Sequence, residues 1–222
     1  MATAPTDTRT PLRLRWRRVG VILLLVAAMI LAGVQLFGRE KTPPKPAAFS
    51  CSPGPHCYRS TTQTSFPTFG NVYPSNLSDC MVAAAADWEI IVRHRHPSPS
   101  AVIDDYRHAA TSDTAGLNED VFAWYWSSYG VDGFTMKAWH VLAVSSQIDV
   151  ERAVRKHRAL YAVFDFRDDS TLAGKRVGAG GHAAIIDGFT PKGPLVVTWG
   201  TTYQMTWPEF WTSASSLRSV EG

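Results

Sequence analysis

The spacing of apolar and polar positions changes along the chain and divides it into three parts. Val19 to Phe37 is a run of nineteen residues without a charge. Between about residue 80 and residue 157, apolar residues recur at the spacing of amphipathic helices. From Leu160 onward, short apolar runs alternate with Gly/Pro turns, which is typical of strands. The pattern predicts a membrane-length segment, then helices, then a sheet.

The first predicted helix begins at Cys80 and runs to about His94. Ser78 or Asp79 can cap it by accepting its free N–H groups. The alanines that follow, Ala83–Ala86, favour helix and add no bulk, so another element can approach closely. Three further helices are expected: Ala101–His108, a helix capped by Asn118 that ends near Gly130, and the amphipathic Val150–His157.

The strands are expected in the last third of the chain. Leu160–Phe166 is followed by a polar Gly-rich loop, Gly174–Gly181. His182–Phe189 and Leu195–Gly200 then form a predicted hairpin, and Tyr203–Trp211 adds a strand or a helix. Because the helices precede the antiparallel strands, the predicted class is α+β in two layers, with the Cys80 helix packed on the sheet.

The long apolar run predicts one transmembrane helix. At about 1.5 Å per residue, residues 19–37 span roughly 28 Å, close to the hydrocarbon thickness of a bilayer. Residues 1–18 carry five arginines, so the positive-inside rule places this basic tail in the cytoplasm and the rest of the chain outside. A cleaved signal peptide is the alternative, but its apolar region is normally shorter and followed by small residues. An uncleaved signal anchor is the favoured interpretation.

Charge and cysteines separate the tail from the folded domain. Residues 1–45 hold 8 Lys/Arg and 2 Asp/Glu (net +6), and residues 46–222 hold 14 and 17 (net −3). An acidic domain argues against a nucleic-acid partner. Residues 38–69 are predicted to form a Pro-rich linker that includes a disulfide loop between Cys51 and Cys57. Residues 70–222 are predicted to form the functional domain. Pairing of Cys51 with Cys57 leaves Cys80 as a free thiol.

Cys80 is the candidate nucleophile. At the start of a helix, the positive end of the helix dipole favours a thiolate over a thiol. His182 opens a strand directly after Gly180-Gly181, which allows a close approach to another element. A cysteine and a distant histidine so placed provide the pair that nucleophilic catalysis requires.

These motifs resemble the papain-like cysteine peptidase superfamily over about residues 70–212. That family has its cysteine at the start of a central helix, its histidine at the start of a strand, and Asn-Ser-Trp-Gly after a following strand. This chain has Cys80, then Gly181-His182 through Gly188, then Val197-Thr198-Trp199-Gly200. The resemblance implies a papain-like domain with a peptide or amide substrate, no cofactor and no metal.

The chain departs from the family at two helper positions. Val197 stands where the family has its asparagine, so Thr198 or Asp187 is the candidate to orient the imidazole. Pro74 stands where the family has its oxyanion glutamine, so Asn76, or with less support Asn71, is the candidate to supply that amide. The Cys80 backbone N–H is the other oxyanion donor.

Two other functions fit the same residues. Cell-wall amidases and endopeptidases also show Asp-Cys at a helix start and a histidine followed by an isoleucine and a glycine, as in Asp79-Cys80 and His182–Gly188. The second alternative is a membrane-tethered, non-catalytic binding module in which Cys80 and His182 only pack. The sequence names no protein partner.

Overall fold

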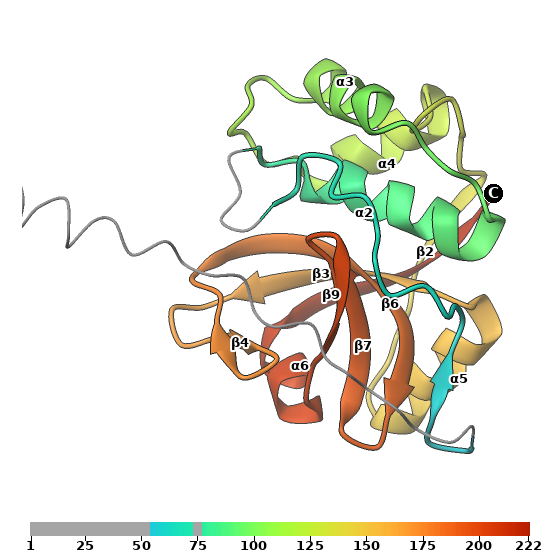
Figure 1. The fold of residues 1–222 in the computed structure, drawn as a ribbon, viewed down its shortest axis with the longest axis vertical. Helices are drawn as coiled ribbons and strands as arrows, with labels where there is room; N and C mark the ends of the chain where they lie inside the picture. Colours follow the sequence, from blue (N-terminus) through green and yellow to red (C-terminus); the bar gives the residue numbers. More distant parts are fainter. Residues whose placement is uncertain (1–53, 73–76) are drawn as a thin grey trace, which may run out of the picture. The chain divides into compact units, whose positions relative to one another are not determined.

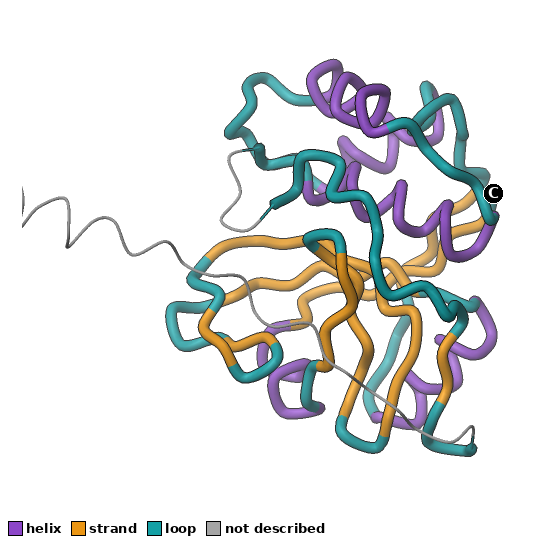
Figure 2. The backbone as a smooth tube through the Cα atoms, viewed as in Figure 1, coloured by secondary structure: helices purple, strands orange, loops and turns teal. Residues whose placement is uncertain are grey.

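The computed structural model describes residues 54–72 and 77–222, which fold around one antiparallel sheet. Figure 1 shows helices α2, α3 and α4 gathered on one side of this sheet, with α5 and α6 on the other side. Figure 2 shows the same arrangement by secondary structure. The domain is therefore α+β, as predicted. The prediction of only two layers is wrong, because helices cover both faces of the sheet.

The helices lie close to where the sequence pattern places them. Asn118 caps α4 through a hydrogen bond from the Asp120 N–H to its side chain (2.8 Å), as expected. The α-helix that begins at Cys80 continues as a π-helix, η1, and ends at His94, whose φ is +56°. The helices are α2 Cys80–Trp88, η1 Glu89–Arg93, α3 Pro99–Ala109, α4 Glu119–Ser128, α5 Gln147–His157 and α6 Trp207–Ser213.

The described residues form a seven-stranded sheet in the order β2-β9-β3-β6-β7-β8, with β1 paired to the far part of β6. The predicted hairpin is present as β6 and β7, which pair up to Thr190 and Gly193. The strands are β1 Tyr58–Arg59, β2 Ala138–Val141, β3 Leu160–Phe166, β6 Gly180–Thr190, β7 Gly193–Thr198, β8 Thr201–Gln204 and β9 Ala214–Glu221; β4 Thr171–Leu172 and β5 Lys175–Arg176 form a separate small hairpin.

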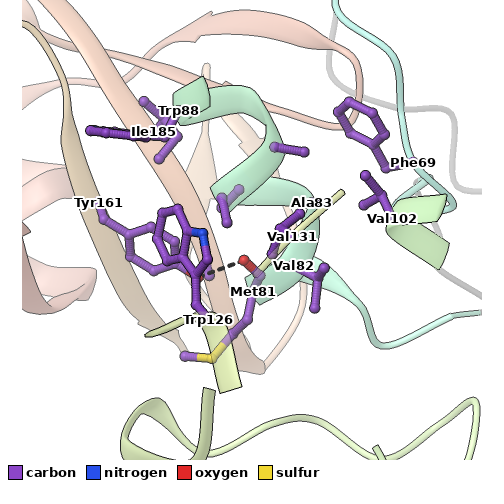
Figure 3. Packing of buried hydrophobic residues seen from close by; sticks show 14 of the residues in the cluster. Phe69, Met81, Val82, Ala83, Trp88, Val102, Trp126, Val131, Tyr161 and Ile185 are labelled. Carbon is purple, nitrogen blue, oxygen red and sulfur yellow. Dashed lines mark hydrogen bonds between the residues drawn. The ribbon is translucent and has the colours of Figure 1, made fainter. Parts of the chain in front are cut away.

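Helix α2 is the buried centre of the helical side. Every residue from Met81 to Trp88 is buried, as expected for a helix that is apolar on all sides. Its backbone is tied to the sheet by the Tyr161 hydroxyl, which donates a hydrogen bond to the Met81 carbonyl (2.8 Å). Figure 3 shows this bond and the packing of Trp126, Tyr161 and Ile185 about the helix. The start of α2 is therefore held in a fixed place against β3 and β6.

Three parts of the fold differ from the sequence predictions. Residues 58–69, assigned to the linker, belong to the packed domain, since β1 pairs with β6 and Phe66 and Phe69 are buried. Strands β2 and β9 were not predicted, although β9 lies inside the sheet between β2 and β3. Residues 203–211 supply both a strand and a helix, β8 and α6, rather than one of the two.

The membrane prediction concerns a part of the chain that is not described. Val19–Phe37, Cys51 and Asn76 all lie outside the described residues. Within residues 54–72 and 77–222, no helix has the length and apolar character needed to span a bilayer.

Candidate active site

Cys80 is the first residue of α2, and its thiol lies against the sheet. The residue is partly exposed and is a free cysteine. The backbone N–H of Ala183, in β6, lies near enough to the sulfur to lower the pKa of the thiol. At the helix start, the Cys80 N–H has no partner within the helix and is available to a ligand. The sulfur and this N–H therefore sit at the junction of α2 and β6.

The surroundings of Cys80 favour the neutral thiol in the resting protein. Burial raises the pKa of the Cys80 thiol, and the neighbouring Asp79 carboxyl raises it further; hydrogen bonds from the N–H groups of Ala183, Met81 and Cys80 itself act in the opposite direction. The direction of this pKa shift is opposite to the one expected from the helix dipole. Loss of hydration outweighs the favourable helix terminus.

His182 stands in β6 directly after Gly180 and Gly181, as predicted. Its ring lies between two aromatic side chains, with ring centres 4.8 Å from Trp199 and 6.1 Å from Phe166. The ring Nε2 and the hydroxyl of Thr198 are 2.7 Å apart and hydrogen-bonded. Burial among these rings lowers the pKa of His182 to about 4. The imidazole is therefore neutral at pH 7 and can accept a proton.

The structure brings some of the predicted site residues together and separates others. Thr198, and not Asp187, is the residue that holds the imidazole. Among the described residues no hydrogen bond joins Cys80 to the ring of His182; the contact between the two elements runs through the N–H of Ala183, the residue after His182. Asn71 is buried near the start of α2, and Asn76 remains a prediction.

Asp79, the residue before Cys80, is completely buried and forms no capping bond at the helix start. Within residues 54–72 and 77–222, neither of its carboxyl oxygens has a hydrogen-bond partner. One oxygen packs against Gly70, where an added Cβ would come within 2.8 Å of it. Burial raises the pKa of Asp79 to about 7. The role of Asp79 as a helix cap, one of two predicted, is wrong, because the carboxyl turns into the interior.

A buried charge network behind the site was missed from the sequence. Arg59 Nε donates to Asp187 Oδ2 (2.9 Å), and its Nη2 donates to the Thr202 hydroxyl (2.8 Å). Asp87, in α2, faces the same carboxyl, and burial together with Asp187 raises the pKa of Asp87 well above its usual value. The sequence did contain one indication of this network, because Asp87 is a single acidic residue in the otherwise apolar sequence of α2. Asp187, in β6, therefore interacts with Arg59 of β1 and Asp87 of α2 and does not orient His182.

A scan against protein-family models and a search of curated proteins each find no match to this chain.

Proposed function

We propose that the domain is a thiol-dependent amide hydrolase of the papain-like type, with Cys80 as nucleophile and His182 as general base. The observation that carries the proposal is the 2.7 Å hydrogen bond between His182 Nε2 and Thr198. When Nε2 donates to the hydroxyl, Nδ1 holds the free lone pair. His182 is then a neutral imidazole whose orientation is fixed through Nε2. It precedes Ala183, the β6 residue whose N–H lies near the Cys80 sulfur. This arrangement suits proton transfer from the thiol to the imidazole.

The reaction would begin from the neutral pair. As the Cys80 sulfur attacks the amide carbon, His182 Nδ1 takes the thiol proton and the carbonyl oxygen becomes an oxyanion. The N–H of Cys80, which has no partner within the helix, would donate to this oxyanion, with the side-chain amide of Asn76 as the second expected donor. His182 then returns the proton to the leaving amine, and a thioester remains on Cys80. Water, deprotonated by His182, attacks the thioester and releases the acid.

Trp199 and Phe166 would have a defined part in this reaction. They pack against the imidazole and exclude water from its hydrogen bond with Thr198. A drier site strengthens that hydrogen bond and holds the ring in one orientation. It also keeps His182 unprotonated down to mildly acidic pH.

The location belongs to the same proposal. We propose that residues 19–37 anchor the chain in a membrane, with the hydrolase domain on the extracytoplasmic side and Cys51 paired with Cys57. Peptides or other amides that reach the membrane surface would be the substrates.

Alkylation of Cys80 by iodoacetamide tests the proposed pair without knowledge of the substrate. If His182 acts as base, the wild-type rate should be nearly constant from about pH 5 to pH 8, because the imidazole is already neutral there. His182→Ala should lower the alkylation rate at pH 7 on the order of 100-fold. In this variant the rate should rise about tenfold per pH unit, because it then follows the fraction of thiolate. Thr198→Val should lower it several-fold, as expected for the loss of one neutral hydrogen bond.

Cys80→Ala supplies the background for this measurement, since it removes the thiol and leaves the other cysteines. A wild-type rate that equals that of His182→Ala and follows an ordinary thiol titration would favour the non-catalytic binding module.

A further inference from the structure

A pocket of about 390 Å³ opens between α3 and α4, in the helical part of the fold. None of its lining residues belongs to the proposed Cys80–His182 site. Its volume is within the range of pockets that hold small molecules. The pocket is lined by His108, Ala109, Val121, Trp124, Tyr125 and Tyr129.

Three aromatic residues line this pocket; Trp124 and Tyr129 are open to solvent, and Tyr125 is buried. Trp124 is 59% exposed and Tyr129 is 62% exposed. Their ring centres lie 5.4 Å apart with the planes at 79°, so the two rings form a corner. Tyr125 adds a third ring, 5.4 Å from Tyr129. Large aromatic side chains gathered at the surface beside a pocket mark a binding site more often than a packing defect.

Acidic and basic groups both lie near the pocket. The Tyr125 hydroxyl donates to Asp105 Oδ1 (3.1 Å), and Arg95 donates to the Asp132 carbonyl (3.0 Å). Asp105 also accepts from the Asp132 N–H (2.7 Å), and it has no salt bridge within the part of the chain that the structure describes. Helix α3 ends at Ala109, so the negative end of its dipole lies at the pocket, where Arg107 and His108 in its last turn offset part of it. Among the described residues that line the pocket, His108 is the basic one.

We propose that this pocket binds a small organic cation, of the quaternary or alkyl ammonium class, through cation–π contacts with Trp124, Tyr125 and Tyr129. Aromatic faces that meet at an angle attract such groups because their π-systems present negative charge. The carboxylate of Asp105, next to the Tyr125 hydroxyl, adds attraction for positive charge. Val121, which is 49% exposed, offers an apolar side chain to the methyl groups of a quaternary ammonium. This site is independent of the hydrolase function.

Titration of the purified full-length protein with choline chloride tests the proposal, with binding followed by calorimetry. Choline should bind at least about tenfold more tightly than dimethylbutanol, the neutral isostere in which carbon replaces the nitrogen. Trp124→Ala and Tyr129→Ala should each weaken choline binding about tenfold or more. Both side chains are exposed, so the variants should fold. Trp211→Ala removes another exposed tryptophan, in α6, and should leave binding unchanged.

Equal affinities for choline and its isostere would overturn the proposal. Choline binding that is unchanged in both Trp124→Ala and Tyr129→Ala, or no choline binding at all, would also overturn it. Tighter binding of N-acetylglucosamine than of choline would also overturn it, in favour of a saccharide site. Vesicles of phosphatidylcholine, compared with phosphatidylglycerol, show whether a lipid headgroup supplies the ammonium group.

Discussion

Replacement of Arg59 by methionine is expected to lower the free energy of unfolding by about 3–5 kcal/mol at pH 7, because it removes one partner of a buried ion pair. The Asp187 side chain is completely buried and receives its ion-pairing hydrogen bond from Arg59. Without the guanidinium, two buried carboxyls, Asp187 and Asp87, would face each other with no positive charge between them. Urea denaturation followed by circular dichroism measures the change.

The double variant Arg59→Met/Asp187→Asn separates charge from packing. It should be more stable than Arg59→Met alone, since the uncompensated carboxylate is also removed. Arg152→Met serves as the matched control: the Arg152 side chain is 72% exposed and pairs with Asp149 on the surface. It should change the free energy of unfolding by less than about 0.5 kcal/mol. A cost below about 1 kcal/mol for Arg59→Met would contradict the description of this network.

The stability of the protein is expected to fall as the pH rises from about 6.5 to 8.5. Burial raises the pKa of Asp79 to about 7 and that of Glu89 to about 8, and the pKa of Asp87 rises as well. In this range the folded state holds protons that the unfolded chain has already released, so each pH unit costs stability. His182 has a lowered pKa and opposes this trend only below about pH 6.5, where the unfolded histidine is protonated.

The expected loss is on the order of 2 kcal/mol, or roughly 5 °C in melting temperature. Asp79→Asn and Glu89→Gln should each reduce this pH dependence, because the amides stay neutral at both pH values. Asp168→Asn is the control, since Asp168 is exposed. A melting temperature that is constant or rises over this pH range would show that these carboxyls ionise freely in the folded state.

The order and extent of most elements followed from local patterns in the sequence. Alanines after a polar turn predicted α2, and the two apolar runs around Pro191 predicted the β6–β7 hairpin. Strand β9 was missed because only Leu217, Ser219 and Val220 of its residues are fully buried, and a short mixed pattern of this kind has no clear period. Helices on the second face of the sheet depend on long-range packing, which local periodicity does not report.

The identity of the site residues was easier to predict than their chemistry. Of the two candidates to orient His182, Thr198 and Asp187, Thr198 is the one that is hydrogen-bonded to the ring. The direction of the pKa shift at Cys80 was not predicted, because it depends on how deeply the tertiary structure buries the thiol. The packing of Phe166 and Trp199 at His182, and the burial of Asp79 beside Cys80, could not be predicted from the spacing of residues. Both favour a neutral thiol and a neutral imidazole.

The most direct test of the proposed hydrolase is the acylation of Cys80 by a simple activated ester. Full-length protein would be mixed with p-nitrophenyl acetate, quenched with acid at short times, and mapped by mass spectrometry. The proposal predicts an acetyl thioester on Cys80 that forms rapidly in the wild type, forms much more slowly in His182→Ala, and is hydrolysed as the reaction proceeds. Acetylation of Cys80 no faster than that of a cysteine in the unfolded chain, or equal rates with and without His182, would contradict it.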